Sequence, residues 1–227
     1  MSYWDRLDKY RDQGPEAAGE TVLRPVKEFN SFLGPLVDEQ LLPLGWTRGK
    51  DLRWARPLQS WAEKIIEFHP LKSGVGIRWG LRLSFIPAIR ERRKSAGDLH
   101  LSYDPLDYQR DVRPWALSRF ATDEELRADA PGLVSRAVAE AQSLDACCRD
   151  LSSLVRCFEE KKARKYVHFG FQHYPKEVLA YAAVLGLVGR KDAALGELDG
   201  AFDRLEVTEE EQQRYRRALA ELWEKGI

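Results

Sequence analysis

The chain has 227 residues, of which 44% are hydrophobic and seven are tryptophan, so it is long enough for one large domain or two small ones with a substantial core. Its 36 basic and 36 acidic residues cancel, which excludes a bulk charge that would attract nucleic acid or an anionic membrane surface. Either partner would need a local patch of basic side chains.

Three cysteines, Cys147, Cys148 and Cys157, lie within one predicted helical stretch, and no Cys/His spacing typical of a metal site occurs. We therefore expect reduced thiols and no metal or other cofactor. The first residues lack the apolar core of a signal peptide, and no uncharged apolar run is long enough to span a membrane. These features predict a cytoplasmic protein without a membrane partner.

The segment 25–42 is predicted to be a helix with one buried face. Pro25 suits its first turn, and Pro43 with Gly45 marks its end. Apolar residues recur along it at steps of three and four, which is the spacing of an amphipathic helix, namely Val26, Phe29, Leu33, Leu36 and Val37.

Four β-strands are predicted to follow, at 51–56, 61–69, 75–87 and 98–103, with turn residues between them. The third has the strongest pattern, because bulky apolar side chains fill its odd positions while Arg78, Arg82 and small residues fill the even ones. The bulky members, which we expect to be buried, are Val75, Ile77, Trp79, Leu81, Leu83 and Phe85.

Strands this close in sequence leave no room for crossover helices, so they predict an antiparallel meander. The 25–42 helix would cover its apolar face. We therefore predict an α+β fold in which residues 1–110 form an antiparallel sheet packed on a helix, and residues 111–227 form an all-helical part that docks on it.

Residues 29–87 contain, in order, a short predicted helix, the exit LLPLGWTRGKDLRWAR, the strand IIEFHPLKS and the strand IRWGLRLSFIP. This order resembles an uncharacterised bacterial family of domains of unknown function. These are fold residues and not catalytic ones. Small α+β domains of this kind occur in toxin-immunity and phage-conflict loci, so the resemblance implies a binding role by association.

The second half is predicted to be helical. Thr122 with Glu125, and Thr208 with Glu211, have the spacing of capping boxes that open helices. Apolar residues recur every seven positions in two series, one from Val134 to Val155 and one from Ala137 to Phe158, which predicts one long helix over 132–162. Further helices are predicted at 176–188, 190–205 and 208–226, with Gly189 and Gly226 as stop residues.

The open face of the sheet is the first candidate site. If the bulky residues of 75–87 point inward, the even positions point outward, and basic residues of neighbouring strands join them. A guanidinium group can hold a carboxylate or a phosphate through its planar donors, whereas the plainer interpretation is a solvated sheet face. The predicted partner-binding residues are Arg53, Lys64, Arg78, Arg82 and His100.

Two other features have plainer interpretations. The basic run 90–94 is short and contains a Glu, as solvated loops often do, although it is also a candidate contact for nucleic acid. His168 and His173 lie among aromatic residues without an acid or Cys at ligand spacing, so packing or surface roles are favoured over a metal site.

No phosphate-binding glycine loop, serine-nucleophile elbow or zinc-protease motif occurs in the chain. We therefore predict a non-catalytic, cytoplasmic protein-binding module, an immunity-type inhibitor that occludes a partner protein. The alternative is a nucleic-acid-associated module that uses the basic sheet face. A third class, an enzyme whose site is assembled from distant residues, leaves no local trace in a sequence.

Overall fold

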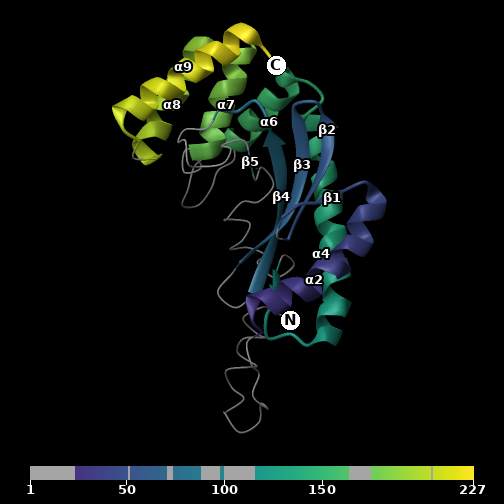
Figure 1. The fold of residues 1–227 in the computed structure, drawn as a ribbon. Coiled ribbons are helices and arrows are strands. Elements are labelled where there is room, and N and C mark those ends of the chain that lie inside the picture. The colour runs from purple at the N-terminus through teal and green to yellow at the C-terminus, as the bar shows by residue number, and fades with distance from the viewer. Residues whose placement is uncertain are drawn as a thin grey trace. The chain divides into compact units, whose positions relative to one another are not determined.

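The computed structural model describes residues 24–50, 52–70, 74–87, 98–99, 116–163, 175–205 and 207–227 (Figure 1). Its fold is α+β, with a helix, an antiparallel meander packed on it, and then an all-helical C-terminal part. The predicted fold class is therefore confirmed. Within these ranges no helix is both long and apolar enough to cross a membrane.

The described strands form one sheet in the order β1-β2-β3-β4-β5, and β6 pairs with β4 off this path. The pairs β1 with β2, β4 with β5, and β4 with β6 are antiparallel. The strands are β1 (Thr47–Arg48), β2 (Arg53–Gln59), β3 (Ala62–Pro70), β4 (Gly74–Leu83), β5 (Asp98–Leu99) and β6 (Ala116–Ser118).

The predicted alternation in β4 is confirmed. The apolar side chains at its odd positions, from Val75 to Leu83, are at most 5% exposed, whereas Arg78 and Arg82 lie partly in solvent. Phe85 falls in the turn after β4, where it is half-buried and meets the Trp61 ring edge-on at 5.9 Å. A shift of the strand by one residue would bury the two arginines, so this burial sets the register.

Helix α2 (Val26–Leu41) covers the apolar face of β2, and its bounds confirm the predicted helix within a residue. Its Asp38 carboxylate accepts hydrogen bonds from the Trp54 indole and from Arg48, both at 2.8 Å. Trp54 is fully buried and meets Phe68 of β3 edge-on at 6.1 Å. The 3-10 turn Leu42–Leu44 then ends at Gly45, whose left-handed backbone favours glycine.

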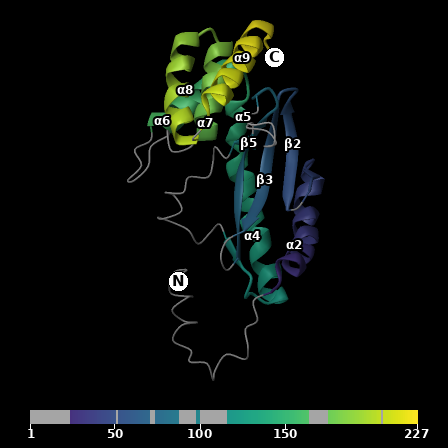
Figure 2. The same ribbon diagram turned by 60° about the vertical axis from the view of Figure 1, so that its left-hand side comes forward.

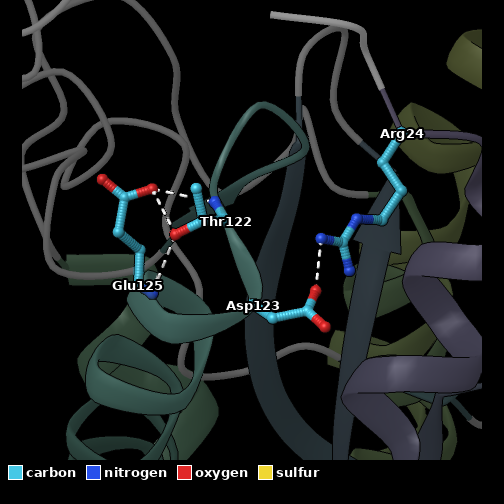
Figure 3. A network of polar contacts seen from close by, with 4 residues as sticks. All are labelled: Arg24, Thr122, Asp123 and Glu125. Carbon is cyan, nitrogen blue, oxygen red and sulfur yellow. Dashed lines mark hydrogen bonds and ion pairs between the residues drawn. The ribbon is translucent and has the colours of Figure 1, made fainter.

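Helix α4 (Asp123–Gln142) begins at the predicted capping box, which is confirmed. The Thr122 hydroxyl accepts from the Glu125 backbone N–H, and the Glu125 carboxylate accepts from the Thr122 N–H at 2.8 Å (Figure 3). Beside the box, Arg24 donates to Asp123. Further along α4, the Arg127 guanidinium lies over the Phe32 ring of α2, and the two helices lie side by side in both views (Figures 1 and 2).

The single helix predicted over 132–162 is wrong. The chain instead forms α4, the short α5 (Leu144–Cys147) and α6 (Leu151–Ala163), with breaks at Ser143 and at 148–150. The heptad positions are nevertheless almost all buried. The pattern therefore identified a continuous apolar stripe but not the turns, because each short helix presents its own part of that stripe to the core.

The break before α6 also overturns the expectation of three reduced thiols. It reverses the chain enough to bring the Cα atoms of Cys147 and Cys157 to 5.7 Å, and the structure joins the two side chains in a disulfide. Cys148 stays a buried free thiol. Burial, and next the Asp145 carboxylate, raise the pKa of its thiol to about 12, so it is held in the unreactive neutral form at neutral pH.

The remaining helices are α7 (Pro175–Leu187), α8 (Lys191–Leu205) and α9 (Glu209–Lys225). The α7 side chains from 178 to 185 are buried all round. Gly189 has the positive φ expected of a helix stop, and the second capping box is present at the start of α9. Trp223 of α9 lies against Gly186 of α7 and donates its indole N–H to the Ala183 carbonyl at 3.0 Å.

The described parts of 1–56, 66–79 and 103–140 form one compact unit, and those of 57–65, 80–102 and 141–227 form another. The predicted division into 1–110 and 111–227 stays a prediction. His100, the run 90–94, His168 and His173 lie outside the described residues, as does most of the strand predicted at 98–103.

Substitution of Gly186 tests the contact between α7 and α9. A Cβ atom there would lie 2.0 Å from the Trp223 ring, so Gly186→Ala has to displace the ring and its hydrogen bond. We expect a loss of roughly 1 to 2 kcal/mol in the free energy of unfolding, measured by urea denaturation followed by tryptophan fluorescence.

Gly196→Ala is the matched control, because Gly196 is an exposed residue within α8 and a Cβ atom added to it would meet no other atom within 4 Å. It should stabilise the chain by about 0.5 to 1 kcal/mol through helix propensity alone. Equal gains from both substitutions would show that Trp223 does not occupy the space above Gly186.

Candidate binding site on the sheet

Three charged side chains from adjacent strands form a cluster on the face of the sheet opposite Trp54. The Glu67 carboxylate of β3 lies between Arg53 of β2 and Arg78 of β4. Arg78 donates its Nε–H to Glu67 Oε1 at 2.5 Å and contacts the same oxygen through Nη2, while Arg53 Nη1 lies 3.4 Å from Oε2. Each carboxylate oxygen therefore faces one guanidinium group.

The alternation of the strands places these groups together. Along β3, the Glu67 side chain points to the opposite face from Ile66 and Phe68. Along β4, Arg78 points to the opposite face from Ile77 and Trp79. The charged side chains of the cluster therefore share one face of the sheet. The Glu67 side chain is 12% exposed, against 22% for Arg53 and 31% for Arg78. A carboxylate this far from water requires compensating donors, and the two arginines supply them.

His69, two residues beyond Glu67 on β3, borders the same cluster. Its ring fills the space above Gly76 of β4, where a Cβ atom would lie 2.5 Å from the imidazole Cε1. Burial of the ring, and next the positive charge of Arg78, lower the pKa of His69 below its usual 6.5, although the Glu67 carboxylate acts in the opposite direction. His69 is therefore predominantly neutral at neutral pH.

A pocket of about 350 Å³ opens beside this cluster, next to the first turns of α2. Its described lining combines apolar side chains with charged and polar ones. Its described lining residues are Val26, Asn30, Lys50, Leu52, Arg53, Glu67, Phe68, His69, Val75 and Arg78.

Two of the five predicted site residues, Arg53 and Arg78, are brought together here. Arg82 points outward as expected, but its guanidinium binds the Glu63 carboxylate at 2.8 Å. The prediction that Lys64 joins the open face is wrong. Its side chain is 3% exposed and pairs with Asp145 of α5 at 2.6 Å, because it has the opposite parity to Glu63 along β3.

The sequence reasoning missed Glu67, His69 and Lys50 as neighbours of the two arginines. A signal for Glu67 is present, since Glu63 and Glu67 are separated by four residues, as are Arg78 and Arg82. Antiparallel pairing of β3 with β4 aligns these two pairs in reverse order, so opposite charges face each other across the strands. The position of Lys50 depends on the turn between β1 and β2, which carries no comparable pattern.

No family model, curated protein or solved structure matches this chain. The family resemblance of 29–87 therefore stays a prediction. Within the described ranges, no group of three or more His, Cys, Asp or Glu side chains is arranged as a metal site.

Removal of the Arg78 charge should raise the pKa of His69. In Arg78→Gln the repulsion between guanidinium and imidazolium disappears, and Glu67 has one cation fewer, so both changes favour protonation of the ring. The pKa is measured by an NMR titration of the imidazole Cε1 proton, assigned with His69→Gln. Arg82→Gln, about 13 Å further along the strand, should leave the His69 pKa unchanged.

The sign of the pH effect on stability follows from the same shift. Because His69 binds its proton less tightly in the folded chain than at the unfolded value of 6.5, its contribution to stability is complete above pH 6.5 and is lost as the pH falls toward the folded pKa. Arg78→Gln should reduce this loss. A folded His69 pKa that is unmoved by the substitution, or lowered by it, would contradict the proximity of the two groups.

The pair of Lys64 and Asp145 should respond unequally to its two single substitutions. Asp145→Asn leaves a buried ammonium without a counter-charge and should cost roughly 1 to 3 kcal/mol in unfolding free energy, less than for a fully buried pair because Asp145 is half-exposed. Lys64→Met replaces the cation with an apolar chain of similar length and should be close to neutral. Equal losses in urea denaturation would show that the pair itself, and not the burial of the ammonium, determines the effect.

Proposed function

We propose that the chain is a non-catalytic protein-binding module, an immunity-type inhibitor that occludes its partner through the face of the sheet carrying Arg53, Glu67 and Arg78. The observation that supports it most directly is this cluster. It presents both charges on three adjacent strands, and side chains held on strands keep a fixed geometry for a partner.

Mixed charge favours a protein partner over a polyanion. A surface that alternates arginine and carboxylate is complementary to a protein surface with the reverse arrangement, and such complementarity confers specificity and speeds association. The zero net charge of the chain agrees with this, since it gives no long-range attraction to a nucleic-acid backbone.

The second candidate is the nucleic-acid-associated module, which would use Arg78 and Arg82. Each of these guanidinium groups is bound to a carboxylate, Glu67 or Glu63. A phosphate would have to compete with those carboxylates, so the release of counterions on binding would be small. This candidate predicts binding to a labelled single-stranded or duplex oligonucleotide that weakens steeply between low and physiological salt.

Affinity capture tests the proposal. The tagged chain, immobilised at low salt in extract of its native host, should retain one protein in stoichiometric amount. Arg78→Ala should abolish this retention, because it removes a guanidinium and leaves Glu67 with one cation fewer. Arg216→Ala, which breaks an exposed ion pair with Asp199 on the C-terminal helices, should retain the partner as the wild type does.

Two results would contradict the proposal. One is recovery of nothing above background with the wild-type chain. The other is equal recovery with Arg78→Ala, provided that its circular dichroism and urea midpoint show it to be folded. Binding of the oligonucleotide with a steep salt dependence, lost in Arg78→Ala, would favour the second candidate instead.

A further inference from the structure

The short helix α5 is joined to two other elements by its own side chains. Cys147 is linked to Cys157 of α6 by the disulfide, and the Asp145 carboxylate lies 2.6 Å from the Nζ atom of Lys64 on β3. A helix of four residues has almost no stability of its own. These two contacts, together with the burial of Leu144, therefore hold α5 in place.

The disulfide constrains α5 more strongly than the ion pair does. Asp145 is 53% exposed, and water screens an exposed pair so that it contributes little. The disulfide joins two cysteines that are 10 residues apart, and a cross-link over so short a loop lowers the population of open conformations about 100-fold. Opening the disulfide therefore removes the main constraint on α5.

Both redox states of the two cysteines are compatible with the structure. The Cα atoms lie 5.7 Å apart, the usual spacing of a disulfide. Cys157 is half-buried, so a small thiol in solution can reach it, whereas Cys147 is buried. After reduction the Cys147 thiol has an acceptor available, because the Ser143 carbonyl oxygen lies 4.0 Å from its Sγ atom.

Cys148 is next to the disulfide in the chain, but it is a poor nucleophile toward it. Its thiol is buried, and burial followed by the Asp145 charge raises its pKa to about 12. Thiol–disulfide exchange requires a thiolate, so Cys148 does not compete for the disulfide at neutral pH. Because its side chain is only 1% exposed, its reactivity instead reports whether α5 has moved.

We propose that the disulfide between Cys147 and Cys157 is a reversible redox switch that fixes α5 to α6 when oxidised and releases it when reduced. A small dithiol serves as the reductant. One of its thiolates attacks the Cys157 sulfur, the S–S bond breaks, and the electron pair leaves on the Cys147 sulfur. The second thiolate then attacks the mixed disulfide, which releases Cys157 and oxidises the dithiol to its own disulfide. Both cysteine thiolates take up a proton.

The reduced state permits a local opening that the oxidised state prevents. As α5 separates from α6, Asp145 leaves the Lys64 ammonium, which is 3% exposed in the closed state, and Cys148 becomes accessible to solvent. Openings of this kind involve a small part of a fold while the remainder stays closed. The switch does not use the cluster of Arg53, Glu67 and Arg78, so it stands or fails independently of the proposed function.

The first experiment is a redox titration of the folded full chain in mixtures of reduced and oxidised dithiothreitol. Free thiols are trapped with iodoacetamide and located by mass spectrometry. We expect a single reversible transition in which Cys147 and Cys157 gain the label together. Cys148→Ala should leave its midpoint unchanged. Either of two results would overturn the switch: the two cysteines stay thiols at the oxidising end, or they are reduced only after urea is added.

The second experiment measures the rate at which iodoacetamide labels Cys148 in each redox state, after removal of dithiothreitol. Reduction should speed this labelling about tenfold or more. Cys157→Ser, which cannot close the disulfide, should be labelled at the fast rate in both states. Equal rates in the oxidised and reduced wild-type chain would contradict the release of α5.

Hydrogen exchange separates a local release from a general loss of stability. In the reduced chain, amides of residues 144–156 should exchange faster, whereas those of α7 to α9 should keep their rates. A uniform increase over both regions would show that the disulfide only stabilises the whole fold, and this result would also overturn the proposal.

Discussion

The candidate site depends on one carboxylate held between two guanidinium groups. Glu67 is 12% exposed, and a carboxylate so far from water is stable only with charged donors on its oxygens. Arg53 and Arg78 provide them from the strands on either side of β3. The interaction thereby joins three strands, and both of its charges act on His69, whose pKa is lowered chiefly by burial.

The sheet could be predicted from the sequence because its strongest signal is local. In β4, bulky and charged residues alternate strictly, so the buried face and the outward direction of Arg78 and Arg82 follow from parity alone. The partners of these arginines depend on how β3 pairs with β4. The alternation within one strand does not tell which of its two faces is buried. The direction of the Lys64 side chain could therefore not be predicted, since it depends on which face of β3 joins the core.

The helical part shows a similar division between local and non-local information. Both capping boxes and the Gly189 stop were predictable, because each is determined by residues three or four apart. The breaks around α5 were not, since the buried stripe continues across them. The disulfide between Cys147 and Cys157 depends on those breaks, and so does the place of Asp145 beside Lys64.

The coupling between Arg78 and Glu67 is the property on which the site and the proposed function both depend. A double-mutant cycle with Arg78→Gln, Glu67→Gln and the double variant measures it through urea denaturation. The account predicts that the double variant is more stable than the sum of the two single losses implies, by about 1 to 3 kcal/mol. Strictly additive losses would show that the two side chains do not interact, and would remove the basis for the site.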